Sequence, residues 1–419
     1  MNFFILAIGL SIVALVIVRL AISIHQSLQR MQYNTQADLL SLQLLEQKIS
    51  VAQREFENTN EGWNGYRKFE IAKKKMEADN TCSFYLKPHD GKSISAFRPG
   101  QYLTFRLNIP GQEKAVIRCY SLSDCFCPDY YRVTIKKVLP PPNNPMQPPG
   151  LVSSYFHEDL NEGDIVDVQA PNGHFVLDPK NDRPAVLIAG GVGITPILSM
   201  AKSIAAAEST REFFVFYGVR HGQEHAFKEE LAQLEQNHNC RVIVCYSDPT
   251  ENDLEVEGVQ YQHHGWVSVG LMKSYLASTN YEFYICGPPP LMASMSEQLK
   301  SWGVADANVF TEAFGPATIK KVAPAKKEES KDDSDACQVV FEKSNVTVKW
   351  NPDTGNLLDF ALENGVEIPS GCRAGNCGTC TIAIKSGSVQ YVSEPGAQLE
   401  EGSCLTCIAS PDDDLILDA

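Results

Sequence analysis

An almost unbroken apolar run opens the chain. Every residue from Phe3 to Val18 is apolar or small, and after Arg19 the run resumes from Leu20 to Ile24. About 20 residues in a helix cross the hydrocarbon core of a bilayer, and an arginine near the end of the run can extend to the headgroups. The pattern predicts a transmembrane helix within residues 1–26, inserted in the lipid bilayer through residues 3–24. A cleaved secretory signal is the alternative, but it needs a basic start and a small-residue cleavage site, which are both missing here.

A second helical pattern lies within residues 27–61, which we expect to form a juxtamembrane helix. Apolar residues recur there at the spacing of one helix face, at Leu39, Leu42, Leu45 and Ile49. Positive charges follow the apolar run and none precedes it; the first ones are Arg19, Arg30, Lys48 and Arg54. Because cytoplasmic flanks carry the excess of Lys and Arg, we expect a single-pass membrane protein with its catalytic domains on the cytoplasmic side.

Two regions with different strand patterns come next. Residues 62–178 contain short alternating or β-branched runs broken by Gly and Pro, such as Tyr102–Phe105 and Tyr131–Ile135. Many short strands separated by turn signals predict an antiparallel β-barrel. Residues 179–315 instead alternate continuous apolar strands, the first at Ala185–Ala189, with helical patterns. Continuous apolar strands are typical of strands buried on both faces, so this region predicts an α/β domain with a parallel sheet flanked by helices.

The remaining chain divides into a linker and a final domain. Residues 316–336 are charged and rich in Ala, with almost no large apolar side chains, so we expect a flexible linker. Residues 337–419 form a compact unit with 12 acidic residues against 4 Lys and Arg, more than half of the chain's net charge of −15. Because binding to phosphate backbones takes clustered Lys and Arg, this charge argues against nucleic acid as a partner. It favours docking to a basic patch of another protein.

Thirteen cysteines are present, scattered except for one cluster in the final domain. A secreted disulfide framework is denser and even in number, so the scatter favours a reducing compartment. The cluster has the spacing C-x4-C-x2-C with a distant fourth cysteine, which is the spacing of plant-type [2Fe–2S] ligands. A structural zinc site is the alternative, but zinc modules usually pair two equally spaced knuckles. We expect the iron ligands to be Cys372, Cys377, Cys380 and Cys407, with Cys404 as the one rival to Cys407.

The final domain resembles plant-type ferredoxins over essentially all of residues 337–419. The segments that carry the resemblance are S-G-C-R-A-G-N-C-G-T-C-T and the later L-x-x-G-x-x-L-T-C. The resemblance implies a β-grasp fold and a one-electron carrier of low potential.

The segment Arg118-Cys119-Tyr120-Ser121 places three useful groups on one predicted strand. A bound flavin needs a cation for its phosphates, an aromatic face for its ring system and a hydroxyl near the nitrogen that receives hydride. Arg118 and Tyr120 lie on the same face of a strand, and Ser121 follows them. Further along, Gly150 begins a predicted helix whose amides and Ser153 hydroxyl suit a pyrophosphate. The two segments together indicate a flavin site; on its own, Tyr120 is equally well explained as a core residue.

The parallel-sheet region carries two further motifs. A glycine-rich segment, G-G-V-G-I-T-P, follows the first apolar strand, and its glycines allow a tight turn and a close approach of pyrophosphate to the helix start. A second motif, C-G-P-P, ends a later strand at the carboxyl edge, where such sheets bind ligands. A plain buried thiol is the alternative for its cysteine. The motifs predict a nucleotide site formed by Gly190, Gly191, Gly193, Thr195, Pro196, Cys286, Gly287 and Pro288.

These motifs resemble those of the ferredoxin–NADP reductase superfamily, and especially the reductase region of flavohemoglobins. The matching stretches include F-R-P-G-Q-Y-L, R-C-Y-S-L-S-D, Y-Y-R-V-T-I-K-K and the G-L-V-S helix. The resemblance implies FAD rather than FMN. It assigns Arg118 to the flavin phosphate, Tyr120 to the ring and Ser121 to the hydride-accepting nitrogen. The ribityl–phosphate contacts would come from Ile135 and Lys136, and the pyrophosphate contacts from Val152 and Ser153 in the helix that Gly150 begins.

The same resemblance concerns the nicotinamide nucleotide. It places Cys286 beside the reactive carbon and Phe314, in Glu312-Ala313-Phe314-Gly315, beside the flavin. We therefore expect a catalytic centre formed by Tyr120, Ser121, Cys286 and Phe314. The choice between NADH and NADPH stays open, because Arg220 and His221 offer cations of the kind that a 2′-phosphate needs, whereas the likeness to flavohemoglobins favours NADH.

Three cofactor sites in one chain predict an electron-transfer enzyme. A flavin converts a two-electron hydride into single electrons, which a [2Fe–2S] cluster accepts one at a time. We expect hydride to pass from NADH (or NADPH) to FAD, and electrons to leave through the cluster to a membrane or membrane-associated redox protein, such as an oxygenase or desaturase. The order flavin–nucleotide–ferredoxin resembles the reductase components of such systems. The alternatives are a subunit of an NADH:quinone-type respiratory reductase and a membrane-tethered redox sensor.

Overall fold

The computed structural model describes residues 19, 62–63, 65–113, 115–140, 144–207, 210–314, 337–370, 373, 375, 378–391, 395 and 399–419. Contacts divide the chain into Met1–Gly62 and Trp63–Ala419, and nearly all described residues belong to the second unit. The predicted transmembrane helix, apart from Arg19, the juxtamembrane helix and the linker 316–336 lie outside the described residues. In the part of the chain that is described, no helix has the length and apolar character needed to cross a membrane.

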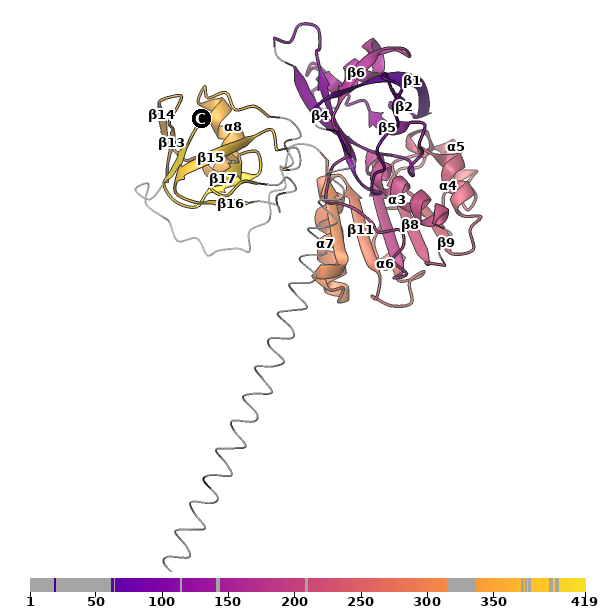
Figure 1. Cartoon of the computed structure of the whole chain (residues 1–419). Helices are drawn as coiled ribbons and strands as arrows, with labels where there is room; N and C mark the ends of the chain where they lie inside the picture. The colour runs from indigo at the N-terminus through magenta and orange to yellow at the C-terminus, as the bar shows by residue number, and fades with distance from the viewer. Residues whose placement is uncertain are drawn as a thin grey trace, which may run out of the picture. The chain divides into compact units, whose positions relative to one another are not determined.

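The first domain, coloured indigo to purple in Figure 1, is an antiparallel sheet. Its six strands follow the order β4-β3-β6-β1-β2-β5. A bridge links Leu122, the residue after edge strand β4, with Val133 of the other edge strand, β5, so the sheet curls toward the predicted barrel. Its core combines aliphatic and aromatic side chains, with Phe69, Phe84 and Phe105 fully buried. The strands are β1 (Arg67–Ala78), β2 (Thr81–Pro88), β3 (Tyr102–Leu107), β4 (Val116–Ser121), β5 (Tyr131–Lys136) and β6 (Ile165–Val168); helix α2 (Leu151–Ser154) and a π-helical turn (Tyr155–Asp159) follow β5.

The second domain is a six-stranded parallel sheet in the order β10-β9-β8-β7-β11-β12. Its strands are β7 (Ala185–Gly190), β8 (Phe213–Val219), β9 (Cys240–Tyr246), β10 (His263–His264), β11 (Glu282–Gly287) and β12 (Val309–Ala313). Its helices are α3 (Ile194–Ala206), α4 (Lys228–Leu234), α5 (Glu251–Leu254), α6 (Val269–Met272) and α7 (Pro289–Trp302), with 3-10 turns at Gly191–Gly193, Gly222–Glu224 and Asp306–Asn308.

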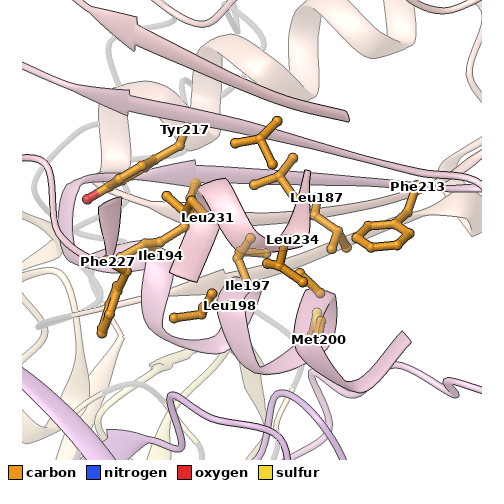
Figure 2. Packing of buried hydrophobic residues seen from close by; sticks show 14 of the residues in the cluster. Leu187, Ile194, Ile197, Leu198, Met200, Phe213, Tyr217, Phe227, Leu231 and Leu234 are labelled. Carbon is orange, nitrogen blue, oxygen red and sulfur yellow. The ribbon is translucent and has the colours of Figure 1, made fainter. Parts of the chain in front are cut away.

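The two faces of this sheet are covered by different helices. Successive side chains of a strand point to opposite faces, so Leu187 packs with α3 and α4, whereas Ile188 packs with α6 and α7. Figure 2 shows the first of these layers, in which Ile197 of α3 and Leu234 of α4 pack beside Leu187. Burial on both faces explains why the strands are continuously apolar in the sequence, and the α/β domain predicted there is confirmed.

The third domain has a five-stranded sheet in the order β14-β13-β19-β15-β17 and a separate pair, β16-β18. The β13–β19 pair is parallel and the other neighbours are antiparallel, so the sheet is mixed. One helix, α8, buries Leu357, Leu358 and Phe360 in the same core as the sheet. The elements are β13 (Gln338–Phe341), β14 (Val346–Lys349), α8 (Leu357–Glu363), β15 (Thr381–Ser386), β16 (Val389–Tyr391), β17 (Ser403–Leu405), β18 (Ala409–Pro411) and β19 (Leu415–Leu417), with a 3-10 turn at Pro352–Thr354.

The buried side chain of Arg211 connects the segment before β8 with the start of strand β11 in the parallel sheet. The Arg211 guanidinium is fully buried; it forms an ion pair of 2.7 Å with Glu282 of β11 and donates hydrogen bonds to the carbonyls of Asp178 and Arg183.

Removing one partner of a buried ion pair leaves the other charge uncompensated. We predict that Arg211→Ala lowers the free energy of unfolding by about 3–5 kcal/mol, measured by calorimetry on the purified chain. Arg241→Ala, at an exposed position of β9, is the control and should change it by less than about 0.5 kcal/mol; equal losses would contradict the prediction.

Candidate active site

Strand β4 holds the arginine, tyrosine and serine that the sequence singled out. Tyr120 packs edge-to-face against Phe105 and Phe156, with ring centroids 5.8 and 5.4 Å away. Burial raises the pKa of the Tyr120 phenol well above its ordinary value, so the ring stays neutral. Arg118 lies two residues earlier, and its Nη1 donates to the carbonyl of Ile117 at 2.7 Å. This strand therefore presents a half-exposed cation and a firmly packed aromatic ring, as a flavin phosphate and ring require.

Ser121 meets a buried carboxyl group from the second domain. Its side chain is 5% exposed and hydrogen-bonds with Glu312 on β12. Glu312 is the register partner of Cys286 on the neighbouring strand β11. The antiparallel sheet thus contributes the hydroxyl, and the parallel sheet contributes the carboxyl and the thiol. The resemblance implied that Ser121 and Cys286 belong to one site, whereas Glu312 is not in the predicted catalytic set.

The electrostatics of this group follow from its burial. Burial raises the pKa of Glu312 to about 8, and the hydrogen bond with Ser121 only partly opposes that rise. Burial, reinforced by the nearby Glu312, likewise raises the pKa of the Cys286 thiol well above its ordinary value. Both groups are therefore neutral near pH 7. Cys286 here is no thiolate nucleophile, because a reactive cysteine needs a lowered pKa.

One polar atom of this group is left for a ligand. Among the described residues, Glu312 Oε2 is buried and has no hydrogen-bond partner. A buried acceptor without a partner is costly unless a bound molecule satisfies it. A flavin and a nicotinamide both carry donors at their ring edges, so the residues present at this position fit the two cofactors that the sequence predicts.

The glycine-rich turn brings main chain against main chain. A Cβ on Gly193 would lie 2.2 Å from the carbonyl oxygen of Cys286, and one on Gly287 would lie 3.1 Å from the amide nitrogen of Gly190. Only glycine allows β7 and β11 to end this close together. Gly191 has φ +54°, which glycine adopts without strain. Thr195 and Pro196 are buried in the first turn of α3, where Thr195 Oγ1 donates to the Val192 carbonyl at 3.0 Å. Pro288 precedes α7 at the same edge.

The predicted phosphate residues lie near β4 but are partly engaged by the protein itself. The Ser153 hydroxyl donates to the Gly150 carbonyl at 3.0 Å and accepts from the Val138 amide at 3.1 Å. Val152 is buried in the barrel core, as is the side chain of Ile135. Contacts from Val152 and Ile135 to a flavin therefore have to come from their main chain.

Lys136 and Phe314 complete the set of predicted site residues. Lys136 forms an ion pair of 3.4 Å with Glu224 of the second domain. Phe314 follows β12 and packs, partly buried, against the core of that domain. Lys136 therefore faces the second domain and Phe314 belongs to it, and the cofactor contacts of both residues stay predictions.

The cluster site is described in part. Cys372 and Cys377 lie outside the described residues. Cys380 and Cys407 are both buried, and Thr406 ties their segments together by donating its amide and its hydroxyl to the Cys380 carbonyl, at 3.2 and 3.0 Å. Cys404 is fully buried within β17, where burial raises its pKa to about 12. The choice of Cys407 over Cys404 as the fourth ligand stays a prediction.

Comparison with known proteins assigns each domain to a class. Residues 68–177 match the oxidoreductase FAD-binding domain, residues 187–297 the oxidoreductase NAD-binding domain, and residues 339–412 the 2Fe-2S iron-sulfur cluster binding domain. The predicted FAD, NAD(P)H and [2Fe–2S] cofactors are thereby confirmed at the level of domain classes. The predicted domain boundaries and individual cofactor contacts stay predictions.

Three relatives place the chain more closely. It is 38% identical over 273 residues to a flavohemoprotein from Halalkalibacterium halodurans, covering 64% of this chain and 65% of that protein, so it spans just under two thirds of the relative's length. It is 31% identical to the flavohem-like FAD/NAD binding domain of nitric oxide dioxygenase from Vibrio cholerae, covering 60% of this chain and all of that domain with a TM-score of 0.53. Phthalate dioxygenase reductase is 25% identical, with a TM-score of 0.53, and the match covers 85% of this chain and 98% of that one.

The fold and the site together define a flavin-dependent pyridine nucleotide oxidoreductase with an iron–sulfur domain. More closely, its first two domains are an oxidoreductase FAD-binding domain and an oxidoreductase NAD-binding domain, and the pair is similar to the flavohem-like FAD/NAD binding domain from Vibrio cholerae. Here that pair of domains is followed by a 2Fe-2S domain.

Glu312 generates a testable pH dependence. Its pKa of about 8 means that the carboxyl group is neutral below that pH and becomes an anion above it. A buried anion beside the hydride acceptor opposes the arrival of further negative charge. We predict that the rate of flavin reduction by NADH, measured by stopped-flow absorbance, falls as the pH rises through about 8. In Glu312→Gln, which cannot ionise, this decline should be absent.

The matched control is Glu297→Gln, an exposed position on α7, which should keep the wild-type pH profile of flavin reduction.

A second measurement, of thermal stability, checks the direction of the Glu312 pKa shift. Because the folded-state pKa lies above the ordinary 4.5, this group's contribution to stability is lost as the pH rises from about 4.5 to about 8. The Tm of Glu312→Gln relative to wild type should therefore increase over that interval. A decline in rate that persists in Glu312→Gln would assign it to another group.

Proposed function

We propose that the chain is an NAD(P)H-dependent reductase that passes electrons from a hydride donor through FAD and the [2Fe–2S] cluster to an acceptor protein. The observation that carries the proposal is the meeting of Ser121 with Glu312 and Cys286 across two cofactor domains. A third domain with two buried cysteines at the predicted ligand positions follows in the same chain. The enzyme class predicted from the sequence agrees with the matched domains.

The chain's own side chains have defined tasks in this scheme. FAD supplies the conversion of a two-electron hydride donor into single-electron output. Tyr120 offers a rigid aromatic surface, because Phe105 and Phe156 hold its ring from two sides. Ser121 and the neutral Glu312 can each donate or accept a hydrogen bond, so together they can hold a proton beside the reacting atoms. The buried surroundings of Cys286 exclude water from this position.

NADH is the nucleotide that the charges favour. Arg220, which follows β8, forms an ion pair with Glu224, and Glu224 also pairs with Lys136. The Glu224 carboxylate neutralises the charge of Arg220 and repels the 2′-phosphate that NADPH would add. We therefore extend the proposal to NADH over NADPH, to be judged by the ratio of kcat/KM for the two nucleotides.

An oxygenase or desaturase component is the acceptor that we propose. The support is the likeness to phthalate dioxygenase reductase, a modular structure for electron transfer from pyridine nucleotides to [2Fe–2S]; the match covers 98% of that protein. An NADH:quinone-type reductase subunit and a redox sensor are the alternatives. A sensor would be reduced without rapid turnover, so steady NADH-dependent reduction of a one-electron dye separates it from an enzyme.

We further propose that residues 3–24 anchor the reductase in a membrane with the catalytic domains on the cytoplasmic side; the apolar run supports the anchor, and the Lys and Arg residues on its C-terminal side support the orientation. The test is cell fractionation. The full chain should sediment with membranes and resist extraction by alkaline carbonate, whereas residues 63–419 expressed without the run should not. Release of the full chain by carbonate would contradict the anchor.

The cluster provides a test with a matched control inside one segment. Cys407→Ser should abolish the [2Fe–2S] signal in electron paramagnetic resonance and the reduction of cytochrome c, while NADH still bleaches the flavin. Cys404→Ser, three residues earlier and fully buried, should keep both the signal and cytochrome c reduction. The opposite pattern would make Cys404 the ligand. Bound zinc in place of iron and acid-labile sulfide in the wild-type chain would refute the proposed function.

A further inference from the structure

One face of β5 is polar and turned toward the second domain. Arg132, Thr134 and Lys136 alternate along the strand and so share that face. The Arg132 side chain is 2% exposed, yet it belongs to none of the predicted cofactor contacts. Its guanidinium binds Glu230 of α4 with two contacts, Nη1 to Oε1 at 2.7 Å and Nη2 to Oε2 at 3.1 Å. A bidentate pair fixes orientation as well as distance.

Two further charges complete a cluster that crosses the domain interface. Asp124 lies 3.5 Å from Arg132 Nε, and Lys202 of α3 pairs with both Asp124 and Glu230. The first domain supplies Arg132 and Asp124, and the second supplies Glu230 and Lys202. Cations and anions alternate, so the cluster has no net charge. In addition, Ser199 Oγ donates to the Asp124 carbonyl at 2.7 Å.

The same arginine is tied to the strand end that carries Ser121. Arg132 Nη2 donates to the Ser123 carbonyl, and the Ser123 amide donates back to the Arg132 carbonyl at 2.8 Å. The Ser123 hydroxyl also lies 2.8 Å from Thr134 Oγ1. Ser123 is only two residues from Ser121. A displacement of Arg132 therefore moves the segment on which Ser121 sits.

The partner helix has a constrained start. Phe227 precedes α4 with a left-handed backbone, φ +60°, which is unusual for a residue with a side chain. Such a conformation persists where the surroundings determine it. The Phe227 ring lies 5.1 Å from the Arg132 guanidinium, and Figure 2 shows its side chain beside those of Ile194 and Leu231. The strained residue and the arginine together hold the first turn of α4 where Glu230 reaches Arg132.

We propose that Arg132 is a positioning residue that couples the docking of the NAD-binding domain to the placement of Ser121. Arg132 binds Glu230 and is connected to Lys202 through Asp124, and it also donates to the carbonyl of Ser123. These contacts set how closely the strand edge that carries Cys286 and Glu312 approaches Ser121. The inference rests on the proposed function, since hydride transfer needs donor and acceptor atoms within about 3–3.5 Å of each other. An error of 1 Å costs about a hundredfold in rate.

The test uses the full chain with Arg132→Gln, Arg132→Lys and the nearly isosteric Glu230→Gln. Arg106→Gln is the control, because Arg106 belongs to the same barrel and its ion pair of 2.9 Å is with Asp167 of that barrel. Two quantities are measured: amide hydrogen exchange in residues 119–125, and the rate of flavin bleaching at saturating NADH beside the NADH Kd from the same titration.

In Glu230→Gln we expect exchange in residues 119–125 to become at least about threefold faster, although the substitution lies in the other domain. Flavin reduction should slow about tenfold or more in both Gln variants, with the NADH Kd changed less than about threefold and flavin content unchanged. Arg132→Lys keeps the charge without the bidentate contact and should be intermediate. Arg106→Gln should change neither quantity.

Unchanged exchange in residues 119–125 of Glu230→Gln would overturn the proposal. So would a lower Tm of Glu230→Gln or Arg132→Gln with an unaltered rate of flavin reduction. If Arg132→Gln does not fold, Glu230→Gln and Arg132→Lys decide. Failure of the proposed function is distinguishable, since it would appear as a wild-type chain that NADH does not bleach, whereas the exchange measurement requires no turnover.

Discussion

Contact of main chain with main chain at the carboxyl edge of the parallel sheet is the constraint on which the other features depend. A Cβ on Gly193 would clash with the carbonyl oxygen of Cys286, and a Cβ on Gly287 would crowd the amide nitrogen of Gly190. Because β7 and β11 end together there, the 13-residue helix α3 and the 14-residue helix α7 both begin at this edge. Their N-terminal amides then face one region, which suits the phosphates of a dinucleotide. The glycines therefore fix the site through sterics before any charged side chain acts.

A second consequence concerns the buried carboxyl group. β12 pairs with β11 in a register that sets Glu312 beside Cys286, and the Glu312 side chain is buried there. Low polarity raises its pKa to about 8, and a neutral acid can donate a hydrogen bond as well as accept one. Burial therefore keeps the Glu312 carboxyl protonated near pH 7, where it can donate a hydrogen bond. Its position in a strand makes that environment permanent, whereas a loop residue could turn outward.

The sequence predicted the parts of the fold and site that depend on local patterns. Alternating short runs indicated the barrel, continuous apolar strands indicated the parallel sheet, and the glycine and cysteine spacings indicated Gly193, Cys286 and Cys380 as site residues. It could not predict pairings between distant segments, such as Arg132 with Glu230, which are 98 residues apart. No local period encodes which two charges meet in a domain interface. For Ser153, the local motif predicted a pyrophosphate contact. In the structure its hydroxyl already bonds to the Gly150 carbonyl at the helix start and to the Val138 amide.

The interface between the two cofactor domains shows why charge was used where apolar packing would hold more firmly. Desolvating Arg132 and Glu230 offsets much of their mutual attraction, so a buried ion pair of this kind contributes little net stability. Apolar surfaces would bind more strongly, but dispersion and hydrophobic contacts are non-directional and tolerate sliding. A planar guanidinium with two fixed partners permits one orientation. For an enzyme whose donor and acceptor lie on different domains, a small stability gain matters less than a fixed distance, and the alternating charges at Asp124 and Lys202 serve that requirement.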